Sequence, residues 1–156
     1  MQTLGWREWG ALPDLGVDTI HMKVDTGAKT SCLHAFKLEP FTRDGRSWLR
    51  IWLHPEQDSD RELICEAPVS DQREVTDSGG HTETRYVIKT RLVLGEFNGE
   101  IELTLTNRDT MRYRMLLGRQ AMRQRFIVNP AAAHLLGPKP DSTAALTDAP
   151  SKEPSA

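Results

Sequence analysis

Alternating apolar and polar residues predict that much of the chain forms β-strands. In the segment 20–24, IHMKV, three apolar residues alternate with His21 and Lys23, which is the period of a strand with one buried face. The segment 100–106, EIELTLT, repeats this alternation. The same reasoning predicts further strands over 47–55, 61–69, 86–97 and 111–117.

A hairpin and one short helix complete the predicted elements. Asn98-Gly99 lies between two predicted strands, and this dipeptide readily adopts the positive φ angles of a type I′ turn. The segment 118–126, GRQAMRQRF, holds good helix formers for about two turns. Many short strands with one short C-terminal helix favour a mainly β fold built as a small closed β structure.

Composition sets the domain boundaries. The chain has 156 residues, which suits one domain with its own core. Residues 138–156 hold four of the nine prolines and no aromatic residue, so we expect a folded domain over 1–137 and a disordered tail over 138–156.

Charge and cysteine content add further expectations. A net charge of −2 does not call for a nucleic-acid or membrane partner. The first residues lack the apolar core of a signal peptide, and we expect a cytoplasmic protein in which Cys32 and Cys65 are free thiols.

The segment 21–31, HMKVDTGAKTS, admits three interpretations. GAKTS resembles the end of a phosphate-binding loop, but Ala28 precedes Lys29 and Lys23 stands where the first glycine belongs, so nucleotide binding is rejected. Asp25-Thr26-Gly27 also suits an ordinary turn. The third interpretation is a catalytic aspartate on a tight turn that follows a buried strand.

Two distant segments together favour the third interpretation. The apolar strand leads into Asp-Thr-Gly-Ala, and much later two leucines precede Gly118 and a short helix. This pairing resembles the retropepsin family of aspartic proteases. The chain is more similar still to bacterial retropepsin-like proteins often labelled ATP-dependent zinc proteases, some of which are encoded near ribosomal-protein glutamate ligases. Five segments in order carry that resemblance over about residues 5–130: GWREWGALPDLG, KVDTGAKTS, SGGHTETRYVI, IELTLTNRD and MLLGRQAM.

The resemblance implies a closed β-barrel that forms half of an acid protease. It implies an aspartic endopeptidase, with Asp25 as the catalytic carboxylate. Thr26 would tie two active-site turns together through its hydroxyl, Gly27 and Ala28 would complete the turn, and Gly118 would pack behind it.

The chemistry requires a second carboxylate that shares a proton with the first. Asp77-Ser78-Gly79 is a weak candidate, because the residues before it are polar. We expect instead a homodimer whose two-fold axis brings two Asp25 side chains together. Ser78, Gly79, Gly80 and His81 are then candidates for a flap over the substrate, although an ordinary exposed turn is the favoured interpretation of this segment.

The residues give little support for a metal or cofactor. The histidines are scattered, and Cys32-x-His34 and His81-x-Glu83 each offer only a pair of ligands, whereas zinc needs three or four. We expect no metal and no cofactor, and a zinc-dependent hydrolase stays a weaker alternative.

An arginine-rich window points to an acidic partner. It holds a single acid, Asp109, beside Arg108, Arg112, Arg114, Arg119, Arg123 and Arg125. Arg112, Arg114, Arg119 and Arg123 would suit an acidic, glutamate-rich peptide or protein, and a solvated face is the simpler interpretation. Nucleic acid is not expected. The alternative to a peptidase is a non-catalytic binding or regulatory protein on the same fold that acts with the ribosomal-protein glutamylation machinery.

Overall fold

The computed structural model describes residues 1–76, 79–107 and 112–140. The chain is mainly β, with one short 3₁₀ turn (Pro13–Leu15) and one short helix, α1 (Arg119–Met122). The strands are β1 (Gln2–Leu4), β2 (Arg7–Leu12), β3 (Val17–Val24), β4 (Ser31–His34), β5 (Lys37–Arg43), β6 (Arg46–Leu53), β7 (Leu63–Pro68), β8 (Asp71–Thr76), β9 (Thr82–Leu94), β10 (Phe97–Thr106), β11 (Met115–Leu117) and β12 (Phe126–Val128).

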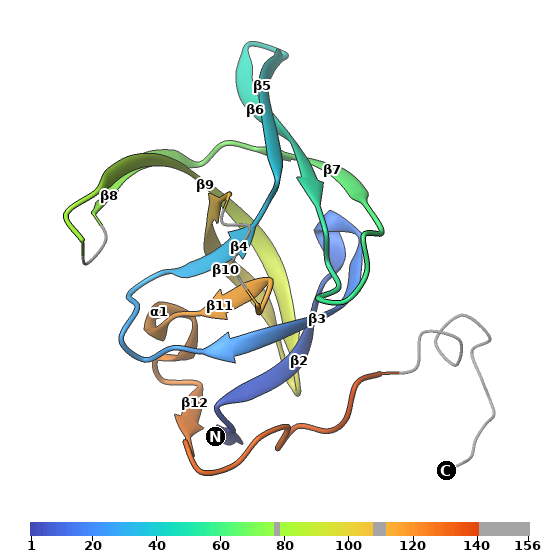
Figure 1. The fold of residues 1–156 in the computed structure, drawn as a ribbon, viewed down its shortest axis with the longest axis vertical. Coiled ribbons are helices and arrows are strands. Elements are labelled where there is room, and N and C mark those ends of the chain that lie inside the picture. The colour runs from blue at the N-terminus through green and yellow to red at the C-terminus, as the bar shows by residue number, and fades with distance from the viewer. Residues whose placement is uncertain (77–78, 108–111, 141–156) are drawn as a thin grey trace.

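A closed barrel forms the body of the molecule (Figure 1). Its strands follow the order β10-β4-β11-β3-β2-β9, and β9 pairs back onto β10, so no free edge remains in this ring. β8 pairs with β9 outside the ring. Closure removes the unpaired strand edges that would otherwise invite association. The expected retropepsin-like barrel with one short C-terminal helix is confirmed.

The strand β11 determines where the site lies. It enters between β3 and β4, parallel to β3 and antiparallel to β4. The turn that joins β3 to β4 therefore lies beside the residues that follow β11. The topology alone brings residue 25 close to residue 118.

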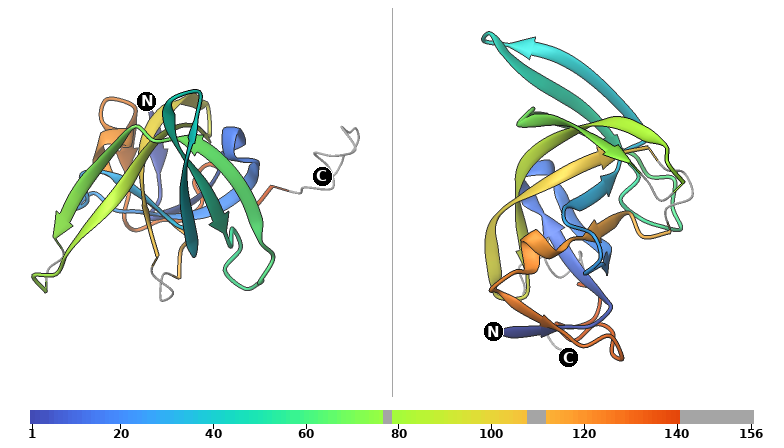
Figure 2. Two further views of the ribbon diagram at one scale, coloured as in Figure 1. Left: turned by 90° about the horizontal axis from the view of Figure 1, so that it is seen from above. Right: turned by 90° about the vertical axis from the view of Figure 1, so that its left-hand side faces the viewer.

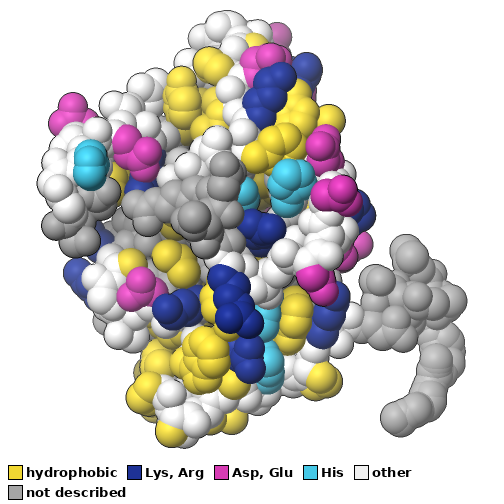
Figure 3. Space-filling model, in the orientation of Figure 1, with side chains coloured by type: hydrophobic (Ala, Val, Ile, Leu, Met, Phe, Trp, Pro, Cys, Tyr) yellow, Lys and Arg dark blue, Asp and Glu magenta, His cyan; other side chains and the backbone are white. Residues whose placement is uncertain are grey.

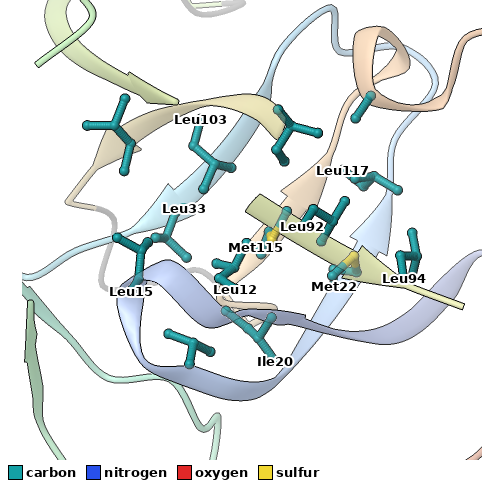
Figure 4. Packing of buried hydrophobic residues seen from close by; sticks show 14 of the residues in the cluster. Leu12, Leu15, Ile20, Met22, Leu33, Leu92, Leu94, Leu103, Met115 and Leu117 are labelled. Carbon is teal, nitrogen blue, oxygen red and sulfur yellow. The ribbon is translucent and has the colours of Figure 1, made fainter. Parts of the chain in front are cut away.

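Leucine, isoleucine and methionine side chains fill the barrel (Figure 4). Ile20 and Met22 project inward from β3, and Met115 and Leu117 project inward from β11. Each of these four side chains is at most 1% exposed. Burial of this kind contributes about 1.5–3 kcal/mol per side chain, so the strands that carry the turn are firmly anchored.

A second sheet, of order β5-β6-β7, projects from the barrel (Figures 1 and 2). Its inner side is apolar, with Leu49, Ile51 and Leu53 at most 1% exposed. The loop from β6 to β7 returns to the barrel and contacts β3, as described below.

Three local predictions were wrong. The hairpin between β9 and β10 exists, but its turn lies at Gly95, whose φ is +59°, and not at Asn98-Gly99. Both Asn98 and Gly99 lie inside β10, and the Phe97 ring would be 2.8 Å from a Cβ at Gly99. The strand expected over 111–117 begins only at 115, and the helix expected over 118–126 covers four residues.

Further expectations concerned the cysteines and the C-terminal tail. Both cysteines are free thiols, as predicted. Residues 141–156 of the expected tail lie outside the described residues. Across the described ranges, no helix combines the length and the apolar character that crossing a membrane requires.

Candidate active site

Asp25 stands on a tight turn at the end of β3. Its main-chain N–H donates to the carbonyl of Leu117 at 2.9 Å, which continues the β3–β11 pairing by one residue. The N–H of Ala28 donates to the carbonyl of Asp25 at 3.2 Å and closes the turn. The Gly27 N–H donates to Asp25 Oδ1 at 3.0 Å. Main-chain groups therefore fix the orientation of the carboxylate.

The helix α1 holds the turn from the other side. Main-chain N–H groups of Arg119 and Gln120 donate to the carbonyls of Ala28 and Lys29, at 2.9 and 3.1 Å. The Arg119 guanidinium also donates to the carbonyls of Thr26 and Gly27, at 3.3 and 3.1 Å. One arginine thus binds two successive carbonyls of the active-site turn.

Gly118 lies against the segment that leads from the turn into β4. A Cβ at this position would lie 2.6 Å from the carbonyl carbon of Thr30. Its N–H donates to the buried Ser31 hydroxyl at 2.9 Å. Only glycine allows the two main chains to approach so closely. Gly27 is less constrained, because the nearest atom to a Cβ there would be Asp25 Oδ1 at 3.3 Å.

In a single copy of the chain, the turn that carries Asp25 is accessible to solvent. Asp25 is partly buried, whereas Thr26, Gly27 and Lys29 are exposed. The carboxylate is therefore both rigidly held and accessible to another molecule.

The segment Asp77-Ser78-Gly79 falls in the sequence between β8 and β9. Asp77 and Ser78 lie outside the described residues. Gly79, Gly80 and His81 are exposed, and Gly80 has a φ of +85°. In Figure 1 the end of the β8–β9 hairpin and the turn after β3 lie on the same side of the molecule.

Comparisons with known proteins agree with this geometry. A model of the protein family described as "Retropepsin-like aspartic endopeptidase RimB" matches residues 3–139. The chain belongs to the RimB-like family. A crystal structure of a Legionella pneumophila protein of unknown function has a TM-score of 0.73 and 26% sequence identity, covering 86% of this chain and 98% of that one.

Curated relatives of this RimB-like chain carry a different name. A protein of Parasynechococcus marenigrum named "Probable alpha-L-glutamate ligase" is 53% identical over 86% of this chain. A Shewanella pealeana protein of the same name is 48% identical over 88% of this chain. The chain spans only 29% and 30% of the length of these two relatives.

The described arginines of the arginine-rich window contact different parts of this RimB-like chain. Arg119 contacts the Asp25 turn, and Arg125 lies over the Phe97 ring at 4.7 Å. Arg112 and Arg114 line a cavity near His21, and Arg123 is exposed at the end of α1. Arg108 and Asp109 lie outside the described residues.

The candidate ligand pairs do not extend into larger clusters. Cys32 and His34 are buried on β4, and Glu83 pairs with Arg85 at 2.6 Å. Among the residues that the structure describes, no group of three or more His, Cys, Asp or Glu side chains is arranged to hold a metal ion. Burial raises the pKa of Cys65 to about 11, which keeps this thiol protonated and unreactive at neutral pH.

Sequence reasoning missed the surroundings of His21. This residue is 8% exposed and lies on β3, four positions before Asp25. Its Nε2 lies 2.8 Å from Nε2 of His134, a residue 113 positions away. No short-range pattern in the sequence connects these two residues.

Proposed function

We propose that two copies of this chain form an aspartic endopeptidase in which the two Asp25 carboxyl groups are catalytic. The observation that supports this most directly is the turn itself. Asp25 is fixed by hydrogen bonds from the Gly27 N–H and to the Leu117 carbonyl, yet it stays accessible. Preorganisation of this kind lets a carboxylate act on a reacting group without rearrangement.

The reaction needs one ionised and one protonated carboxyl group. Two like charges at close range do not both ionise readily, so the pair shares one proton. The ionised carboxylate accepts a proton from water, and the water oxygen attacks the peptide carbonyl carbon. The protonated carboxyl donates to the carbonyl oxygen, and the resulting tetrahedral intermediate collapses as the amine leaves with a proton.

The second carboxyl group is proposed to come from a second copy of the chain. Asp77 is a poor source within the same chain. The strand before it, β8, is exposed, whereas the strand before Asp25, β3, is largely buried. A two-fold axis beside Asp25 would bring two identical turns together. The exposed Thr26 would then meet its equivalent across the axis.

The substrate is proposed to bind as an extended strand. Peptidases of this kind gain affinity through main-chain hydrogen bonds to an added strand. The β8–β9 hairpin tip, with Gly79, Gly80 and His81, would cover that strand and exclude water. Arg112, Arg114, Arg119 and Arg123 favour an acidic, glutamate-rich peptide or protein through their positive charge.

Replacing the carboxylate tests the proposal. Asp25→Asn should abolish peptide cleavage while the dimer and the thermal unfolding midpoint stay near wild type. Asp18→Asn, an exposed aspartate on the same strand, is the matched control and should retain full activity. Full cleavage by Asp25→Asn, or full activity of a strictly monomeric enzyme, would overturn the proposal.

A regulatory role is the second candidate, and the relatives' names favour it. In those proteins the matched region is less than a third of a chain named as a glutamate ligase. A chain acting as a binding partner of such a ligase would keep its effect on ligase activity after Asp25→Asn. A peptidase role predicts that the same variant loses the effect. A zinc-dependent hydrolase, the weaker alternative, predicts stoichiometric metal in the purified protein and inhibition by a chelator.

A further inference from the structure

A cavity of about 700 Å³ lies beside β3, away from the Asp25 turn. This volume is within the range of sites that hold small organic molecules. Strands β2 and β3, the loop from β6 to β7, the approach to β11 and the C-terminal segment all contribute to its wall. The lining residues on which the argument depends are Trp9, Thr19, His21, Gln57, Arg114 and Lys139.

Its floor is an aromatic stack. Trp9 and His21 are cross-strand partners on β2 and β3, and their rings lie parallel with centroids 4.0 Å apart. His21 Nδ1 lies 3.0 Å from Gln57 Oε1, which only accepts, so Nδ1 carries a proton. His21 Nε2 and His134 Nε2 lie 2.8 Å apart, so one of these two nitrogens donates a hydrogen bond to the other. The floor is thus a flat aromatic surface.

Its walls carry three basic and two acidic side chains. Arg112, Arg114 and Lys139 line the cavity, and Lys139 Nζ lies 5.4 Å from the centroid of the Trp9 ring. Figure 3 shows Lys and Arg side chains gathered beside histidine on this face. Two acids also line it, but Glu56 is already bound by Arg61 at 3.1 Å. Asp58 is exposed at the rim.

One polar group of the wall lacks a partner. The Thr19 hydroxyl is buried and makes no hydrogen bond to any described residue.

We propose that this cavity is a binding site for an organic carboxylate. The carboxylate lies between the guanidinium and ammonium groups of Arg112, Arg114 and Lys139, and the carbon skeleton rests on Trp9. Planar bidentate binding by arginine suits a carboxylate.

Such a carboxylate has two sources. It belongs either to a small free acid or to an acidic side chain of a bound peptide. His21 and Asp25 are four residues apart on one extended segment, which corresponds to about 13 Å. An extended peptide cleaved at Asp25 would therefore place a residue about four positions from the scissile bond over the cavity. The peptide source rests on the proposed function, whereas the free-acid source does not.

The decisive experiment compares glutarate with its uncharged counterpart glutaramide. Both are titrated into the full chain carrying Asp25→Asn, with calorimetry and the NMR shift of the Trp9 indole N–H as readouts. We expect glutarate to bind at least tenfold more tightly and to shift the Trp9 signal. Arg114→Gln, and independently the exposed Arg112→Gln, should each weaken binding at least fivefold. Arg91→Gln, an exposed arginine on β9, is the matched control and should bind as the parent does.

The second arm tests the peptide source in the same protein. A capped hexapeptide with one aspartate is compared with the same peptide carrying asparagine. Carboxylate-dependent binding that Arg114→Gln weakens supports the site in either arm, and the tighter ligand identifies the source. If neither glutarate nor the aspartate peptide binds better than its neutral counterpart, the site is excluded. Because binding is measured without catalysis, that result is independent of whether wild type cleaves peptides.

Discussion

Two sites lie along β3, and they are built in different ways. At the C-terminal end, main-chain hydrogen bonds from Gly27 and to Leu117 hold Asp25, with a glycine behind the turn. Toward the middle of the strand, side chains hold His21, through Gln57 and His134. A backbone site tolerates almost no change of shape, whereas a side-chain site tolerates exchange of its parts and responds to protonation.

The largest expected effect concerns Gly118. Gly118→Ala places a methyl group 2.6 Å from the Thr30 carbonyl carbon, and the surrounding main chain cannot move away freely. We expect the free energy of unfolding to fall by about 3 kcal/mol, since overpacking of this kind is costly. Chemical denaturation measures the loss.

The control for this variant is Gly99→Ala. There a new methyl group meets the outer end of the Phe97 ring at 2.8 Å, and that ring can rotate away. Its cost should be clearly smaller than that of Gly118→Ala. Equal stability losses in the two variants would show that the main-chain contact behind the turn is not special.

A somewhat smaller effect is expected at Glu8, which supports the side-chain site. Its fully buried carboxylate accepts main-chain hydrogen bonds from Gly5 at 2.6 Å, Leu135 at 2.9 Å and Leu136 at 3.1 Å. This holds the segment that carries His134 against the barrel. Glu8→Gln turns an amide N–H₂ toward these donors and should cost about 2 kcal/mol.

Two measurements separate this effect from that of Gly118→Ala. Denaturation gives the total loss, and hydrogen exchange of residues 129–137 gives the local loss. We expect Glu8→Gln to increase exchange in that segment more than in residues 25–31. Glu100→Gln, an exposed glutamate on β10, is the control. A uniform increase across the barrel would contradict the local role of Glu8.

The contrast also explains which features the sequence could predict. The Asp25 turn and Leu116-Leu117-Gly118 are each short local patterns, and the resemblance to retropepsins that they carry together implied their contact. The buried face of β3 likewise followed from simple alternation. The fold class was therefore predictable from residues that are neighbours in the chain.

Other features depend on distant contacts. His21 contacts His134 only because the C-terminal segment returns to the barrel. No spacing of residues in the sequence predicts this return. β8 escaped prediction because both of its faces are wet and it shows no apolar alternation. The hairpin turn was misplaced because Gly95 and Gly99 both suit a turn, and the pairing of the whole strands decides between them.

The smallest expected effect is a pH dependence of stability that arises at His21. Burial lowers the pKa of His21 below its usual value, and the neighbouring His134 and Arg7 lower it further, whereas the bond to Gln57 and the charge of Glu8 oppose this. Trp9 and Tyr113 cover the remaining sides of the ring. The unfolded chain therefore binds a proton at a pH where the folded chain does not. Stability is complete above about pH 6.5, and it falls as the pH drops toward the folded-state pKa.

Denaturation series between pH 5 and pH 8 measure this dependence. The His21→Gln variant should lose the decline below about pH 6.5 that wild type shows, because its side chain does not titrate. His81→Gln, at an exposed histidine on the hairpin tip, is the matched control and should keep the decline. Replacing Asp25 should not alter the titration of His21. The Asp25→Asn variant should therefore show the same decline in stability as wild type. A decline that persists in His21→Gln would assign the effect to another group and would remove the distinction between the His21 site and the Asp25 turn.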